Sequence, residues 1–104
     1  VGEILVVMGD FNSPAGSPAY AAITAPGAGS LRDTLTISRT PHFGPLGTFT
    51  GFKIDQDEAS PIDHIFVSDD IMVLRHATLT QQSGGRLPSD HYPVLADFCV
   101  GKGC

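Results

Sequence analysis

Five segments of the chain are rich in apolar, aromatic or β-branched residues, and stretches rich in glycine, proline and polar residues separate them. Residues 3–9 hold a nearly continuous apolar run, which is typical of a central strand buried on both faces. Residues 48–52 have strand-like composition, and the runs at 62–67, 71–79 and 94–100 also predict strands. A short turn joins the runs at 62–67 and 71–79, so we expect these two strands to be antiparallel neighbours.

Helices are predicted to be few and short. Ser17 and Pro18 form a helix start, and the helix over 19–24 should stop at the following proline and glycine. The stretch from Ser30 to Asp33 resembles a capping box that opens another helical turn. The expected fold is therefore α/β, with a mixed, mostly antiparallel sheet. Long loops are predicted at 38–47, 55–61 and 81–88.

The composition limits the classes of protein. The 104 residues suffice for one small domain, and the net charge of −5 argues against a broad basic surface for nucleic acid or anionic membranes. No segment is long and apolar enough to span a membrane. Charged residues are sparse for so small a domain, and the apolar run begins almost at once, so we expect the N-terminal part of a larger domain to be missing. Cys99 and Cys104 do not amount to a disulfide framework and do not indicate a compartment.

Polar residues with catalytic potential lie at three strand ends. Asp10 and Asn12 follow the first predicted strand, Asp63 lies at the start of another, and Asp90 and His91 precede the last. Strands that run in opposite directions bring such ends to one edge of a sheet. The sequence therefore predicts a pocket with three carboxylates, one carboxamide and one imidazole.

This set of groups has a chemical logic. Clustered carboxylates repel one another unless a proton or cation relieves them, and oxygen ligands suit Mg²⁺ or Mn²⁺. A histidine beside carboxylates favours its charged form and can donate to an anionic oxygen. An asparagine amide can donate without adding charge. The reaction that matches these groups is attack of water on phosphorus, in which negative charge spreads over the phosphoryl oxygens.

Three motifs in order carry a family resemblance: GDFN at 9–12, IDHIFVS at 62–68 and SDHYPV at 89–94. Together they resemble the C-terminal half of the endonuclease/exonuclease/phosphatase superfamily, which has the deoxyribonuclease I-like fold. The resemblance covers essentially the whole of residues 1–104, with a less specific likeness at 47–52. It implies the C-terminal half of a four-layer α/β sandwich, and hence a partial domain whose N-terminal half is the partner of this chain.

The resemblance also implies roles for the matching residues. Asp10 would orient and deprotonate the attacking water, and Asn12 would hydrogen-bond the phosphoryl group. Asp63 would hold the ring of His91, which would contact a phosphoryl oxygen. Asp90, together with Asp10, would serve a Mg²⁺ or Mn²⁺ ion. The substrate would be a phosphate ester, drawn from nucleic acids, nucleotides or phospholipid headgroups. The principal metal-binding glutamate of the family lies in its N-terminal half, so the fragment alone is expected to be inactive.

Two other functions stay open on the residues alone. A non-catalytic binding module could keep the fold without the reaction. A serine hydrolase could use Ser13 or Ser89 with His91 and Asp63, although the sequence has no Gly-x-Ser-x-Gly elbow.

Other histidines and aromatic residues have ordinary structural interpretations. His64 alternates away from Asp63 on its strand, which favours a structural or surface role. His42 is expected to be a solvated loop residue, and His76 a strand residue with no special role. Phe49 and Phe52 are expected in the core, in preference to a platform for stacking. Loop acids Asp55, Asp57 and Glu58 are expected to be solvated, because their spacing does not match a calcium loop.

Overall fold

The structure is a computed structural model that describes residues 3–27, 29–53 and 60–104. Most of the loop predicted at 55–61, including its three acidic residues, therefore lies outside the described residues. Within the described part, no helix is long and apolar enough to cross a membrane.

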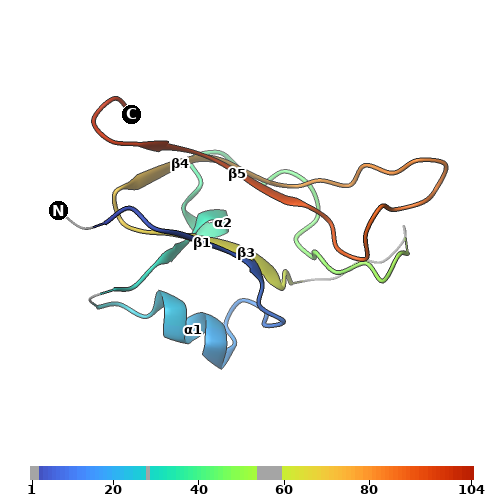
Figure 1. The fold of residues 1–104 in the computed structure, drawn as a ribbon, viewed down its shortest axis with the longest axis horizontal. Helices are drawn as coiled ribbons and strands as arrows, with labels where there is room; N and C mark the ends of the chain where they lie inside the picture. The colour runs from blue at the N-terminus through green and yellow to red at the C-terminus, as the bar shows by residue number, and fades with distance from the viewer. Residues whose placement is uncertain (1–2, 28, 54–59) are drawn as a thin grey trace.

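The strands form two antiparallel sheets (Figure 1). The first has the order β1-β3-β2, from β1 (Val6–Asp10), β3 (Asp63–Val67) and β2 (Arg32–Asp33). The second pairs β4 (Ile71–Thr78) with β5 (Val94–Val100). The predicted α/β class with mostly antiparallel pairing is confirmed.

The predicted pairing of β3 with β4 is wrong, because the two strands belong to different sheets. The side chain of Arg32 lies against the turn between them. Its Nη2 donates to the carbonyl oxygens of Ser68, Asp69 and Ile71 at 3.2, 2.9 and 2.8 Å. These bonds hold the turn against β2, and the Ser68 carbonyl also accepts from the Ile71 amide at 3.4 Å as the chain passes from one sheet to the other.

The core is formed by apolar side chains of β3 and β4 that point inward. Phe66 and Val67 of β3 are fully buried, and Ile71 and Val73 of β4 are each 2% exposed. Val67, Ile71 and Val73 form one cluster, against which Ile37 packs. This core holds β3 firmly and so fixes the position of Asp63 at its start.

Strand β1 is present, but the expectation that both its faces are buried is wrong for the described residues. All five of its residues are exposed, and Met8 is 70% exposed. The strand pairs with β3 along one edge, from Val6 opposite Val67 to Asp10 opposite Asp63. The described residues do not cover its apolar side chains.

Two short helices flank the first sheet. Helix α1 (Pro18–Thr24) begins as predicted, with the Ser17 hydroxyl accepting a hydrogen bond from the Tyr20 amide. Helix α2 (Thr34–Ile37) begins later than predicted, because Asp33 is its N-cap and accepts from the Leu35 amide at 3.0 Å. The preceding residues form strand β2, so the predicted cap at Ser30 is wrong.

The loop at 38–47 lies along β4 and is tied to it by backbone hydrogen bonds. The amide of Phe43 donates to the His76 carbonyl at 3.0 Å, and the amide of Thr78 donates to the Phe43 carbonyl at 2.9 Å. His42 is therefore half-buried and its Nδ1 lies 2.9 Å from Nδ1 of His76, which is 5% exposed. The prediction that His42 is solvated is therefore wrong, whereas His76 is a strand residue of β4 as predicted, with its ring against that of His42.

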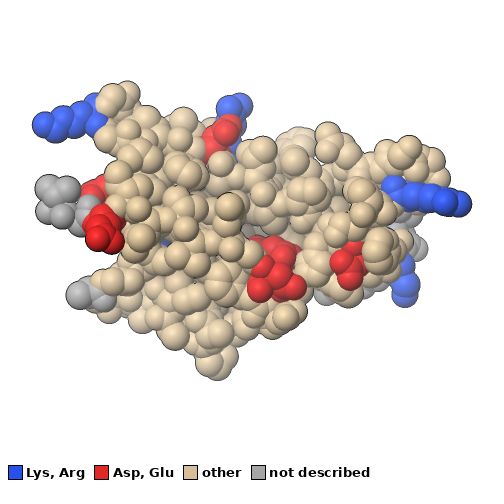
Figure 2. All heavy atoms as spheres, in the orientation of Figure 1, with Lys and Arg blue, Asp and Glu red and all other residues tan. Residues whose placement is uncertain are grey.

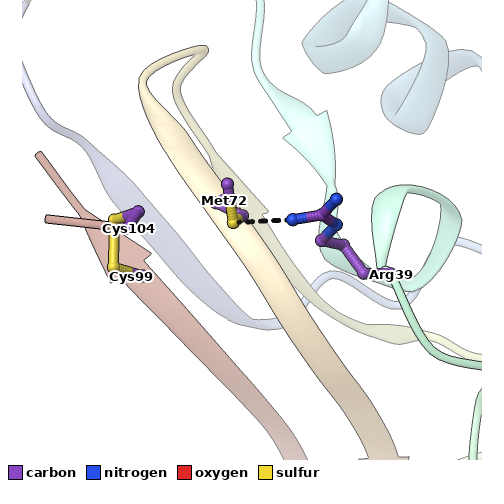
Figure 3. The surroundings of a disulfide bond; sticks show 4 residues. All are labelled: Arg39, Met72, Cys99 and Cys104. Atoms are coloured by element: carbon purple, nitrogen blue, oxygen red, sulfur yellow. Dashed lines mark hydrogen bonds between the residues drawn. A yellow bond between two sulfur atoms is a disulfide. The ribbon is translucent and has the colours of Figure 1, made fainter. Parts of the chain in front are cut away.

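A disulfide joins Cys99 of β5 to Cys104 in the C-terminal tail (Figure 3). Cys99 lies opposite Met72 of β4, whose sulfur accepts a hydrogen bond from Arg39 Nη1 at 3.3 Å. The pairing of the two cysteines was not predicted. It fastens the tail to the end of the second sheet, away from the strand ends that carry the acidic residues.

Candidate active site

The predicted site is built around one aspartate–histidine pair. His91 Nδ1 lies 2.7 Å from Asp63 Oδ2, so this nitrogen donates to the carboxylate. The other ring nitrogen, Nε2, lies 3.7 Å from Asp10 Oδ2 and 4.0 Å from Asp90 Oδ1. Asp10 and Asp63 meet because β1 and β3 are antiparallel with these residues in register. The structure thus brings three of the five predicted site residues around the imidazole of a fourth, His91.

The surroundings of His91 favour its charged form. The hydrogen bond that His91 donates to Asp63 is the largest cause of the raised pKa of the imidazole. Desolvation opposes it, and the negative charges of Asp63, Asp10 and Asp90 each raise the pKa by a smaller amount. In Figure 2, acidic side chains are visible near the end of β1 and the start of β3, and Lys and Arg lie at the periphery of this face. A protonated His91 directs an N–H from Nε2 toward this acidic opening and can donate to an anionic ligand.

Asn12, the fifth predicted residue, is held beside Asp10 by a local turn. Its backbone amide donates to Asp10 Oδ1 at 2.8 Å, which leaves Oδ2 for the side facing His91. Its φ of 48° lies in the left-handed region, which asparagine tolerates better than most residues. The intervening Phe11 donates its amide to the Ile62 carbonyl at 3.0 Å and so anchors the turn to the start of β3.

Thr48 joins the parts of the site and was not predicted. Its hydroxyl accepts from the amides of Ile62 and Asp63 at 3.1 and 3.2 Å. Its carbonyl accepts from the Tyr92 amide at 2.7 Å, and the residue is only 1% exposed. One threonine therefore sets the start of β3 against the segment that carries His91.

The neighbouring residues continue this pairing. The amide of Thr50 donates to the Asp90 carbonyl at 2.7 Å, which places Phe49 directly opposite His91 in an antiparallel bridge. The Phe49 and His91 rings are 5.4 Å apart in an edge-to-face arrangement. Phe49 is 42% exposed and Phe52 is 62% exposed, so the prediction that both belong to the core is wrong.

The donor atoms of the site fit a divalent cation in part. Ligand atoms of Asp10, Asp63 and His91 lie within 4.8 Å of one another. Asp63 and His91 share a hydrogen bond, so their facing atoms are already engaged with each other. The carboxylates of Asp10 and Asp90, on the open side of the ring, are the oxygen donors that Mg²⁺ or Mn²⁺ prefers.

The remaining candidates from the sequence are His64 and the two serines, Ser13 and Ser89. His64 is 3% exposed and its Nε2 lies 2.7 Å from the Ser13 carbonyl, which agrees with a structural role. The Ser89 hydroxyl accepts from the backbone amide of His91 at 3.1 Å, whereas the imidazole Nε2 faces carboxylates. Neither serine is therefore placed as a nucleophile on this ring. A cleft of about 250 Å³ borders the site, lined in part by Met8, Asp10, Asp63, Tyr92 and Val94.

Comparisons with known proteins point to one family. Residues 2–91 match the model of the Endonuclease/Exonuclease/phosphatase family. A mannosyl-6-phosphatase of Bacteroides thetaiotaomicron is similar in structure, with 32% identity and a TM-score of 0.83 over 92% of this chain and 38% of that one. An endonuclease/exonuclease/phosphatase family protein of the same organism has 31% identity and a TM-score of 0.82 over 91% of this chain and 37% of that one.

A conserved protein of unknown function from Enterococcus faecalis is also similar, with 31% identity and a TM-score of 0.82 over 94% of this chain and 37% of that one. No curated protein sequence matches the chain. The chain spans 37–38% of the length of these three structures.

Proposed function

The chain belongs to the endonuclease/exonuclease/phosphatase family, and from this premise we propose that it supplies the phosphate-facing wall of a metal-assisted phosphoesterase site. The reaction is hydrolysis of a phosphate ester by water, without a covalent enzyme intermediate. The observation that carries the proposal is the arrangement of His91, with Asp63 on Nδ1 and Asp10 facing Nε2.

Each residue has a role that its position supports. Asp63 holds His91 in one orientation and keeps it protonated, so Nε2–H donates to a phosphoryl oxygen as negative charge develops there. Asp10 accepts a proton from the attacking water through Oδ2, the oxygen that faces the ring. Asn12, whose backbone amide is bonded to Asp10 in the neighbouring turn, would donate from its carboxamide to the phosphoryl group.

Asp10 and Asp90 would hold Mg²⁺ or Mn²⁺ at the open edge of the site. The ion would offset the charge of the phosphate ester next to the clustered carboxylates. With a net charge of −5, the chain favours binding of a phosphate when such a counter-charge is present.

We propose phosphoric monoesters of sugars as the substrate class. A structure with 32% identity is a mannosyl-6-phosphatase, and the match extends over 92% of this chain. A small monoester also suits an acidic surface better than a long nucleic acid, which requires basic contacts along its backbone.

We further propose that residues 1–104 act as the C-terminal part of one domain. The apolar side chains of β1 are exposed in the described structure, and the similar structures are more than twice as long. The N-terminal part of the domain would cover β1 and add the remaining metal ligands. Residues 1–104 alone are then expected to lack hydrolytic activity.

The test measures phosphate release by the full-length protein from mannose 6-phosphate, and nitrophenol release from bis-p-nitrophenyl phosphate, with Mg²⁺ and with EDTA. We expect release from the monoester that requires Mg²⁺ or Mn²⁺. His91→Ala should lose about 10²–10³ in kcat, as for removal of one donor to the transition state. The matched control is Asp70→Asn, an exposed carboxylate in the turn between β3 and β4.

The outcomes separate the alternatives. Activity that persists in EDTA, or full activity of His91→Ala, contradicts the proposed mechanism. Cleavage of the diester in preference to the monoester leaves the phosphoesterase but replaces the substrate class. Calorimetric binding of mannose 6-phosphate with no hydrolysis of either ester identifies a non-catalytic binding module.

A further inference from the structure

The segment next to His91 has an inverted pattern of burial. Thr48 and Thr50 are each 1% exposed, whereas Phe49 between them is 42% exposed. Alternation of this kind places successive side chains on opposite faces, and here the polar ones are inside. The two threonines are buried because their backbone groups hold the segment that carries Asp90 and Tyr92. Phe49 is left on the face of the site.

The backbone register makes Phe49 a direct neighbour of the catalytic ring. The bonds from Thr50 to Asp90 and from Tyr92 to Thr48, both 2.7 Å, flank the Phe49–His91 pair. This is the non-hydrogen-bonded type of antiparallel pair, in which the two side chains lie closest on the same face. The phenyl ring meets the imidazole edge to face, with 5.4 Å between ring centroids.

A second phenylalanine, Phe52, follows three residues after Phe49 and has an unfavourable backbone conformation. Gly51 and Phe52 have φ values of 60° and 66°, and the Lys53 amide donates to the Thr50 carbonyl at 3.1 Å, as in a type I′ turn. A bulky residue in the left-handed region is an outlier, and such strain is found most often at binding and catalytic sites. Phe52 is nevertheless 62% exposed, so burial does not compensate for the strain.

We propose that Phe49 and Phe52 form an aromatic subsite that binds the sugar ring of the substrate next to its phosphate group. This inference rests on the proposed function and adds the residues that select the alcohol part of the ester. In a hexose 6-phosphate one methylene group separates the ring from the ester oxygen. A phosphate at His91 therefore brings the apolar face of the sugar to the adjacent phenyl ring, where an aromatic platform with few polar groups gives orientation.

The test compares two esters on the full-length protein: mannose 6-phosphate, which has a ring, and glycerol 3-phosphate, which has none. The variants are Phe49→Leu, which keeps apolar bulk against His91, and Phe52→Asn, which removes the ring but suits a positive φ. We expect each to lower the ratio of kcat/KM for the cyclic ester to that for the acyclic ester by about tenfold. In each variant the Kd of mannose 6-phosphate, measured by calorimetry in EDTA, should rise more above the wild-type value than the Kd of inorganic phosphate does.

Phe43→Leu is the matched control, because Phe43 is 73% exposed but lies beside Ala77 of β4. It should leave the ratio at the wild-type value. An equal loss on both esters would overturn the proposal, since Phe49 would then only position His91. An unchanged ratio in both variants would overturn it as well. Failure of the wild-type protein on both esters would instead refute the proposed function.

Discussion

Asp63 Oδ2 accepts a hydrogen bond from His91 Nδ1 at 2.7 Å, so Nε2 is the ring nitrogen that faces the open side of the site. The bond fixes the orientation of the imidazole, and it is the largest cause of the raised pKa of His91. The charge and the direction of the proposed donor, His91, thus depend on one carboxylate at the first residue of β3.

Asp63→Asn should move the pH dependence of catalysis to lower pH. In the wild-type protein His91 stays protonated above its usual pKa of about 6.5, so kcat/KM should fall as pH rises through the raised value. The asparagine removes the largest cause of that shift, so the alkaline limb should begin at lower pH. The measurement is kcat/KM for mannose 6-phosphate against pH, with an NMR titration of the His91 ring protons.

The Asp63–His91 pair also makes the stability of the folded chain depend on pH. Because the pKa of His91 is higher in the folded chain, its stabilising effect is complete below about pH 6.5 and is lost as pH rises through the folded value. Asp70→Asn serves as the control and should leave both profiles unchanged. An alkaline limb at the same pH in wild type and Asp63→Asn would show that His91 is not the titrating donor.

Asn12→Gly should lower kcat by about 10²–10³, the typical cost of removing one donor to the developing oxyanion. Glycine is preferable to alanine here because the φ of 48° suits glycine, so the backbone of the turn should persist. KM should change little, and the free energy of unfolding should stay within a few tenths of a kcal/mol of wild type. A variant with full kcat would remove the carboxamide from the mechanism.

The sequence predicts the elements and the meeting of Asp10 with Asp63, because apolar runs define strands and antiparallel pairing brings their ends together. It does not predict that β3 and β4 belong to two sheets, or that the side chain of Arg32, far away in the sequence, holds the turn between them. Thr48 is missed for the same reason: its partners lie 14 or more residues away.

Apolar character also gives wrong predictions of burial for segments beside the candidate site. Apolar character predicts burial of Phe49 and Phe52, but the threonines beside Phe49 occupy the interior for their hydrogen bonds. The apolar run of β1 likewise predicts burial that the described residues do not provide. In our proposals both surfaces contact something outside the described chain. The two phenylalanines contact the substrate, and β1 contacts the N-terminal part of the domain.

Thr48→Val should destabilise the protein by about 1–3 kcal/mol, although the two side chains have nearly the same shape. The change removes the hydroxyl that accepts from the amides of Ile62 and Asp63 and leaves both donors without it in a buried position. Thr48→Ser, which keeps the hydroxyl, should recover much of the loss. The measurement is the free energy of unfolding from denaturant titration of the full-length protein, and equal values for the valine and serine variants would contradict this role.

The His42–His76 pair provides a second pH-dependent contact, away from the active site. His42 Nε2 lies 2.9 Å from the Pro45 carbonyl and therefore carries a proton. In neutral His42 the other nitrogen then accepts from His76 Nδ1 at 2.9 Å. Burial and the neighbouring His42 lower the pKa of His76 to about 4, despite an opposing effect of Asp33. Two protonated rings would place N–H groups against each other.

Acid should therefore weaken the attachment of loop 38–47 to β4. His76 is neutral in the folded chain down to about pH 4 but takes up a proton near pH 6.5 when unfolded. The contribution of neutral His76 to stability is complete above about pH 6.5 and should fall by about 3 kcal/mol toward pH 4. His76→Asn keeps a donor near Nδ1 but does not titrate, so its free energy of unfolding should depend less on pH across this window. Parallel curves for wild type and His76→Asn would contradict a buried, neutral His76.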